Sequence, residues 1–223
     1  KVMTISQNIA GITRELPPKV KLVAVSKTKG VPEILEAYSA GQRIFGENKV
    51  QEMAAKQPQL PHDIQWHFIG HLQTNKIKFI APFVTMIESV DRLKVLQEVN
   101  KHALAVDRRI PCLLQFHIAE EETKFGLDMA ETKAILDNEY FGKLHNVIIC
   151  GVMGMATFTD DENQVRKEFR QLRKIFDTLK QSYFHSDAAF KEISMGMSGD
   201  YRIAIEEGST IVRLGSIIFG ERG

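Results

Sequence analysis

Short apolar runs alternate along the chain with segments in which apolar residues recur every three or four positions. The helical spacing is clearest in residues 93–103 and 165–179, and a further helix is expected ahead of the first run. The apolar runs are short and bounded by polar residues or glycine, which is typical of buried strands. Eight strands are predicted in this way, over residues 22–26, 43–46, 64–69, 85–90, 111–118, 146–155, 192–195 and 210–214.

This alternation of strands and helices indicates an α/β fold. Eight βα units within 223 residues predict one (β/α)8 barrel of the TIM type, with residues 1–223 forming a single domain. The main alternative is an open doubly wound sheet, which typically has fewer strands. In a barrel, functional side chains collect at the carboxyl ends of the strands. That face would include Lys27, Asn48, Lys124, Ser198 and Arg213.

The composition favours a globular protein of the cytosol. Hydrophobic residues make up 43% of the chain, which is enough for a full core, and the formal net charge is +1. Because lysines and acids are interspersed, neither a nucleic acid nor an anionic membrane is expected as a partner. No apolar stretch approaches the roughly 20 residues of a membrane span, and residues 1–20 lack a secretory pattern. We therefore expect a cytoplasmic protein.

Few residues point to a metal site. Cys112 and Cys150 lie in apolar runs without the paired spacing of zinc ligands, so both are expected to be small buried residues. His67 and His71 share the parity of one strand and could both be ligands, but no third ligand at suitable spacing supports this. A role as polar support around the site is the preferred interpretation.

The strongest chemical signal is Lys27, which closes the first apolar run. A helical pattern begins soon after it, at Pro32, so Lys27 is expected where a strand passes into a βα loop. A lysine in such a place can form a Schiff base, because partial burial or the nearby cation Lys29 would lower its pKa and release a neutral amine that attacks an aldehyde. The alternative is a solvated charge on a loop, which is the commoner position for lysine.

Strand parity predicts which residue lies near Lys27. Side chains at every second position of a strand share a face, so Val23, Val25 and Lys27 point the same way, as do Ile211 and Arg213 of the last strand. The first and last strands are adjacent in a closed barrel. Lys27 and Arg213 are therefore expected to be neighbours at the mouth of the barrel.

The last two strands end in residues suited to a phosphate. Arg213 is followed by Gly215 and Ser216, and the seventh strand leads to Ser198 and Gly199. Loops at these places in TIM barrels commonly bind phosphate through backbone N–H groups, although a glycine and serine pair alone is more often a turn. A lysine that captures aldehydes, facing a phosphate site, fits pyridoxal 5′-phosphate (PLP), which carries both groups. Arg213 would then address the pyridine nitrogen and, because it only donates, leave that nitrogen unprotonated.

Five segments of the chain resemble the pyridoxal phosphate homeostasis protein family. They are VAVSKTK at 23–29, FGENKVQE at 45–52, WHFIGHLQTNK at 66–76, MGMSGD at 195–200 and the stretch 208–220. The segments occur in the order of the family and extend from the first predicted strand to the last, so the resemblance is specific. It implies a barrel related to the N-terminal domain of alanine racemase.

The resemblance also implies the roles of single residues. PLP would be held as an aldimine on Lys27, and Arg213 would face its pyridine nitrogen. The residues around the phosphate would be Ser198, Gly215 and Ser216. Asn48 matches the asparagine that lies near the cofactor. In the fifth strand, His117 stands where the family more often has asparagine, so the part that this strand plays stays open.

Functions of different classes are compatible with these residues. The preferred one is a non-catalytic protein that holds PLP, keeps the free aldehyde low and passes the cofactor to PLP-dependent apoenzymes. The alternative is an amino-acid racemase, which needs a second proton-transfer group, commonly a tyrosine from an extra domain. Of the tyrosines here only Tyr201 is expected near a strand end, so a monomeric carrier with an open site is favoured. A barrel enzyme acting on phosphosugars would keep the phosphate site without the Schiff base.

Overall fold

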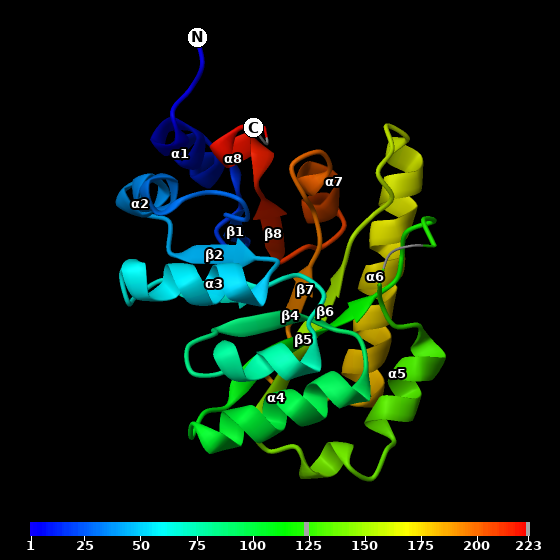
Figure 1. Cartoon of the computed structure of the whole chain (residues 1–223). Helices are drawn as coiled ribbons and strands as arrows, with labels where there is room; N and C mark the ends of the chain where they lie inside the picture. Colours follow the sequence, from blue (N-terminus) through cyan, green and yellow to red (C-terminus); the bar gives the residue numbers. More distant parts are fainter. Residues whose placement is uncertain (123–124, 222–223) are drawn as a thin grey trace.

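Eight parallel strands close into a barrel in chain order, as Figure 1 shows. The computed structural model describes residues 1–122 and 125–221. The strands are β1 (Lys21–Val25), β2 (Ile44–Glu47), β3 (Gln65–Phe68), β4 (Met86–Val90), β5 (Ile110–Phe116), β6 (Val147–Gly154), β7 (Glu192–Ser194) and β8 (Ile211–Leu214). Each strand agrees with its predicted run to within two residues at both ends, and the predicted (β/α)8 barrel is confirmed.

Helices follow the strands and cover the outside of the barrel. They are α1 (Ile5–Glu15), which precedes β1, then α2 (Val31–Ser39), α3 (Val50–Lys56), α4 (Leu93–Ala105), α5 (Met129–Leu136), α6 (Glu162–Ser182), α7 (Tyr201–Glu206) and α8 (Ser216–Phe219). Short 3₁₀-helices are η1 (Gln57–Gln59), η2 (Thr74–Phe79) and η3 (Phe141–Lys143). The connection after β3 contains only η2, and Pro82, which has no N–H to donate, follows it closely. None of the helices that the structure describes is long and apolar enough to cross a bilayer.

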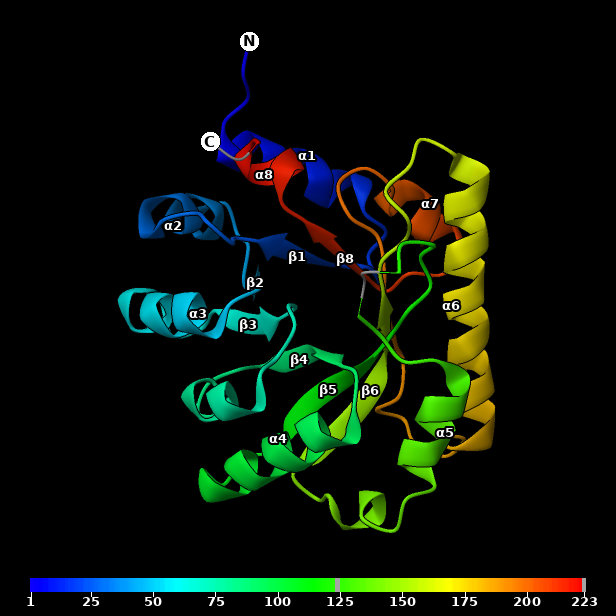
Figure 2. The same cartoon turned by 45° about the vertical axis from the view of Figure 1, so that its right-hand side comes forward.

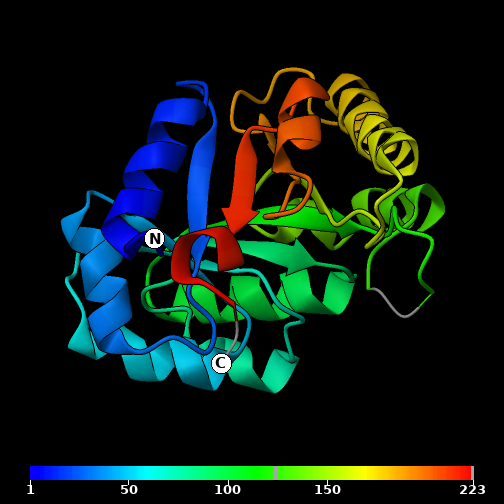
Figure 3. The ribbon, with the colours of Figure 1, turned by 90° about the horizontal axis from the view of Figure 1, so that it is seen from above.

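The first and last elements of the barrel are fastened together. β1 pairs directly with β8, and the two strands lie side by side in Figure 3. Outside them α1 packs against α8, as Figure 2 shows, and Asn8 Nδ2 donates to the carbonyl oxygen of Ile218 at 2.9 Å. At the start of the strand pair, the N–H of Lys21 donates to the carbonyl oxygen of Thr210 at 2.9 Å. These contacts stabilise the closure between the first and last strands.

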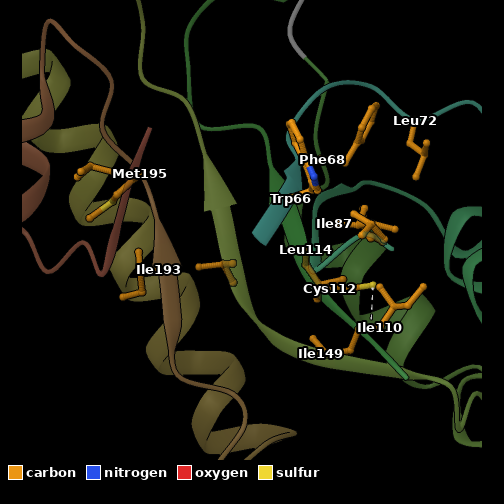
Figure 4. Close-up of a cluster of buried hydrophobic side chains, with 14 of the residues drawn as sticks. Trp66, Phe68, Leu72, Ile87, Ile110, Cys112, Leu114, Ile149, Ile193 and Met195 are labelled. Atoms are coloured by element: carbon orange, nitrogen blue, oxygen red, sulfur yellow. Dashed lines mark hydrogen bonds between the residues drawn. The ribbon is translucent and has the colours of Figure 1, made fainter. Parts of the chain in front are cut away.

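Alternation of side chains along the strands produces two apolar layers. The smaller layer, inside the barrel, consists of Val23, Met86, Leu113, Met153 and Ile211. The larger layer lies between the strands and the helices, and Figure 4 shows part of it, including Trp66, Phe68, Ile87, Cys112 and Leu114. Cys112 is buried as expected, whereas Cys150 is partly exposed, and both are free thiols.

Candidate functional site

A cavity of about 880 Å³ opens at the carboxyl ends of the strands. Its walls come mainly from the segments that follow β1, β6, β7 and β8. Five of the six residues predicted for the site line it, namely Lys27, Ser198, Arg213, Gly215 and Ser216. Residues far apart in the sequence therefore meet where a barrel predicts. Lys124, expected at the same face, lies outside the described residues.

Lys27 lies two positions beyond the end of β1, in the loop that leads to α2. The next two residues, Thr28 and Lys29, also line the cavity. Thr28 has a φ of 66°, in the left-handed region that a β-branched residue rarely adopts. The chain therefore turns sharply directly after Lys27.

Arg213 is held deeper in the barrel by protein contacts. It is 3% exposed, and its guanidinium donates to Ser194 Oγ at 2.5 Å and to the carbonyl oxygen of Gly154 at 3.1 Å. Arg213 pairs in register with Val23, whereas Lys27 comes four positions after Val23 along the chain. The two residues expected to be neighbours at the mouth thus line one cavity at different depths.

A buried carboxylate, Glu88 of β4, joins Arg213 to His67. Oε2 of Glu88 lies 2.7 Å from His67 Nδ1, Oε1 accepts a hydrogen bond from Ser194, and Nη1 of Arg213 lies 3.8 Å from Oε1. Burial alone raises the pKa of Glu88, but the hydrogen bond with His67 and the positive charges outweigh burial and hold this pKa below its ordinary value. The network keeps a charged guanidinium next to the cavity.

The two histidines thus have different surroundings. His67 is 4% exposed and supports Glu88, which agrees with the preferred interpretation from the sequence. His71 stacks on the ring of Phe125, with centroids 4.1 Å apart, and its Nδ1 lies 3.6 Å from Asp91 Oδ2. Within residues 1–122 and 125–221, no group of three or more His, Cys, Asp or Glu residues is placed to hold a metal ion.

Another wall of the cavity carries hydroxyl groups and glycines. Ser198 accepts a hydrogen bond from the backbone N–H of Ile217 at 3.4 Å, so it lies against the first turn of α8, which Gly215 and Ser216 begin. Gly196 has a φ of 108°, and a Cβ there would come within 2.8 Å of a side chain of α7. The turn after β7 therefore requires glycine. Hydroxyl groups and N–H groups at the start of a helix suit an anionic ligand.

Asn48 follows β2 and is not among the residues that line the cavity. Its Oδ1 is buried and has no hydrogen-bond partner in the part of the chain that the structure describes, and the same holds for Nδ1 of His117. Gly70 approaches so closely that a Cβ there would lie 2.2 Å from the carbonyl oxygen of Asn48. A buried polar atom without a partner costs free energy unless water or a ligand satisfies it. The Asn48 amide therefore remains compatible with a binding role.

Sequence reasoning did not single out Glu88 or Ser194. Glu88 stands in the apolar run 85–90, and a carboxylate inside a buried strand needs partners, so this signal was present in the sequence. Ser194 gave no comparable signal, because serine is common at strand ends for many reasons.

Comparison with known proteins places the chain in a family. The sequence model of the family "Alanine racemase, N-terminal domain" matches residues 2–223. A protein of Aquifex aeolicus, named pyridoxal phosphate homeostasis protein, is 40% identical over 203 residues, which are 91% of this chain and 87% of that protein. A human protein of the same name is 40% identical over 230 residues, or 98% of this chain and 82% of that protein. The chain belongs to the pyridoxal phosphate homeostasis protein family.

Solved structures agree with this family and with the barrel. PipY of Synechococcus elongatus without PLP is 36% identical, has a TM-score of 0.90, and covers 97% of this chain and 100% of its own. PipY with PLP bound is 35% identical, has a TM-score of 0.88 and covers the same shares of the two chains. Alanine racemase of Bartonella henselae shares the fold, with a TM-score of 0.71 at 14% identity, over 98% of this chain and 62% of that one.

Proposed function

We propose that this chain binds PLP through a Schiff base on Lys27 and serves PLP homeostasis without a catalytic activity of its own. The observation that supports this most is the meeting of Lys27, Arg213 and Ser198 in one cavity. Relatives of the chain are named for PLP homeostasis, and PipY has been solved with PLP bound. An amine, a guanidinium and a set of hydroxyl and N–H donors are groups that suit a phosphorylated aldehyde.

The chemistry of the lining residues fits PLP. Lys27 would hold PLP by condensation of its amine with the aldehyde, which releases only water and needs no further reagent. The phosphate would be held by Ser198, Gly215 and Ser216. Bound PLP would supply an aldehyde and a ring that can withdraw electrons. Asn48 does not line the cavity, but its Oδ1 is buried with no hydrogen-bond partner among the described residues, and we propose that it lies near the ring.

Arg213 is the residue that favours a carrier over an enzyme. We place it toward the pyridine nitrogen, where a guanidinium can only donate and therefore leaves this nitrogen unprotonated. An unprotonated ring withdraws electrons weakly, so bonds at the carbon next to the imine are poorly activated. Glu88, Ser194 and the carbonyl of Gly154 hold the guanidinium in place.

The tyrosine expected near a strand end does not reach the cavity. Tyr201 is 1% exposed, and its hydroxyl donates to Glu15 Oε2 at 2.8 Å. Burial, together with this hydrogen bond, raises the pKa of Tyr201 to about 12. No tyrosine is among the described residues that line the cavity, so the group that racemases commonly use on the second face is not found there. This supports the carrier function.

The remaining parts of the proposal concern the whole protein. We propose that residues 1–223 act as one PLP-binding domain and that the protein is a cytoplasmic monomer. PLP-dependent apoenzymes would be the recipients of the cofactor.

Borohydride reduction of the PLP-loaded protein, followed by peptide mass mapping, tests this function. We expect one pyridoxyl group, on Lys27, and none in Lys27→Ala, which should stay folded because a residue beyond the strand end contributes little to the core. Lys29→Ala is the matched control, since Lys29 lines the same cavity, and it should still be labelled on Lys27. Labelling of another lysine, or no labelling of the wild-type protein, would contradict the proposal and favour a phosphosugar-binding barrel.

A further inference from the structure

A buried ammonium group lies beside the loop that carries Lys27. Lys56, the last residue of α3, is 8% exposed, which is unusual for lysine. Its Nζ donates to Glu47 Oε1 at 2.6 Å, to the carbonyl oxygen of Ser26 at 2.9 Å and to Glu52 Oε1 at 3.0 Å. Lys56 does not line the cavity, so it would not touch the cofactor.

Both neighbours of Lys27 in the chain are bonded to this cluster. On one side, Ser26 accepts from Lys56 through its carbonyl oxygen, and its Oγ donates to Glu47 Oε2 at 2.9 Å. On the other side, the backbone N–H of Thr28 donates to Glu52 Oε1 at 2.6 Å. Oε1 of Glu52 therefore accepts hydrogen bonds from both the ammonium group of Lys56 and the backbone N–H of Thr28. The backbone is held immediately before and immediately after Lys27.

The conformation of Thr28 shows why such contacts are needed. Its φ of 66° is unfavourable for a β-branched residue, and a strained residue persists only where its surroundings hold it. The N–H of Thr28 is held by Glu52, and Glu52 is itself held by Lys56. Loss of Lys56 would remove the ammonium partner of both Glu52 and the Ser26 carbonyl, and leave them only the backbone N–H groups of Thr28 and Lys29.

We propose that Lys56, acting through Glu47 and Glu52, is a positioning residue that orders the backbone on both sides of Lys27 for attachment of PLP. The inference rests on the proposed function, since it assumes that Lys27 is the point of attachment. Buried ion pairs are often no more stabilising than apolar residues of the same size, so stability alone does not explain the cluster. Ordering a binding loop in advance lowers the entropy cost of binding.

A matched pair of substitutions, one in α3 and one in β1, tests the proposal. Lys56→Met removes the ammonium group and keeps most of the side-chain volume. Lys21→Met is the control, because Lys21 lies at the opposite end of β1, where its Nζ is 2.7 Å from the buried carboxylate of Glu192. Both variants break an ion pair with a buried glutamate, but only Lys56 is bonded to the loop around Lys27.

We expect Lys56→Met to raise the Kd for PLP by about tenfold or more, as expected when a binding loop is no longer ordered in advance. It should also slow the appearance of the borohydride-reducible adduct and shift the pH at which the absorbance of that adduct changes. Lys21→Met should lower the midpoint of urea unfolding while leaving the Kd within about twofold of the wild-type value.

A double variant separates positioning from stability. At pH 8, above the pKa of about 7 to which burial raises Glu47, the single variant leaves the carboxylate of Glu47 without its ammonium partner. In Lys56→Met with Glu47→Gln this carboxylate is absent, so the midpoint of urea unfolding at pH 8 should recover. The carbonyl of Ser26 still lacks its ammonium partner, so the Kd for PLP should stay high. Recovery of both quantities would show a merely structural role and overturn the inference.

Three further results would overturn the role of Lys56. Suppose that Lys56→Met folds and binds PLP with the wild-type Kd, while the wild-type protein is labelled on Lys27. The inference is then overturned and the proposed function stands. Absence of that label in the wild-type protein removes the proposed function and the inference with it. If Lys56→Met does not fold, Glu52→Ala decides the matter, because it frees the N–H of Thr28 on the exposed side of the cluster. An unchanged Kd in this variant then overturns the proposal.

Discussion

Buried charges surround the cavity at two depths. Glu88 and Arg213 lie inside the barrel, and Glu47 and Lys56 lie beside the loop of Lys27. Taking a charge out of water is costly unless an opposite charge and hydrogen bonds compensate it. Substitution of one residue of such a pair is therefore expected to change both the free energy of unfolding and the binding of PLP in the cavity.

Arg213→Gln should lower the free energy of unfolding by about 3 kcal/mol, because it leaves the fully buried carboxylate of Glu88 without its arginine partner. Urea unfolding measures this change. The double variant Arg213→Gln with Glu88→Gln carries no unpaired carboxylate and should lose less than the sum of the two single variants. Additive losses would argue that the two side chains do not interact.

Glu47 makes stability depend on pH near neutrality. Burial raises the pKa of Glu47 to about 7, more than Lys56 and Ser26 lower it. Between pH 4.5 and 7 the folded protein therefore keeps a proton that the unfolded chain releases, so stability falls as the pH rises through this range and levels off above it. The neighbouring Glu52 has a lowered pKa and acts in the opposite direction only below pH 4.5.

Glu47→Gln should remove this part of the pH dependence. Urea unfolding at intervals from pH 5 to pH 8 is expected to give a flatter profile for the variant than for the wild-type protein. Glu139→Gln, which replaces an exposed carboxylate, is the control and should keep the wild-type profile. Identical slopes for Glu47→Gln and the wild-type protein would count against a proton held by Glu47.

Among single residues, the sequence indicated those that end strands. Lys27, Arg213 and Ser198 could be placed because strand parity and the order of strands in a closed barrel follow from the apolar pattern. Lys56 could not, since it lies in an ordinary helical segment and becomes buried only when α3 packs beside β2 and the residue that follows β1. Its three hydrogen bonds depend on that packing and leave no trace in local sequence.

Among elements, the strands were the easiest to predict, because all eight are buried on both faces and so form clear apolar runs. The connection after β3 was harder. Eight βα units imply a helix there, but the structure has only the 3₁₀-helix η2, whose N-cap Gln73 makes no side-chain capping bond. Pro82 ends the segment before a longer helix could form.

α6 offers a test of a cap that lies next to the cavity. Asp161 is its N-cap, and Oδ1 accepts from the N–H groups of Asn163 at 3.1 Å and Gln164 at 3.2 Å. Asp161→Ala should lower the free energy of unfolding by about 1 kcal/mol in urea unfolding. Asp160→Ala removes the adjacent carboxylate, which is not the cap, and should change stability by less than about 0.5 kcal/mol. Equal effects of the two variants would argue against capping by Asp161.

At the scale of the molecule, the question is whether the barrel alone can act as a racemase. It shares its fold with alanine racemase, but this chain covers only 62% of that enzyme. Racemisation removes a proton from one face of the substrate and returns one from the other, so two groups must flank the carbon. Lys27, the proposed point of attachment, would serve one face, whereas Tyr201 is bonded to Glu15 and does not line the cavity.

We therefore expect PLP-loaded protein to form D-alanine from L-alanine no faster than free PLP does at the same concentration. Chiral chromatography of the amino acid measures the rate, and loaded protein in ²H₂O reports any exchange at the α-carbon. A slow exchange without inversion would fit a single base, because Lys27 could remove and return a proton on one face only. Saturable formation of D-alanine that Lys27→Ala abolishes would instead make the chain an enzyme, with an acid on the second face that the open barrel does not reveal.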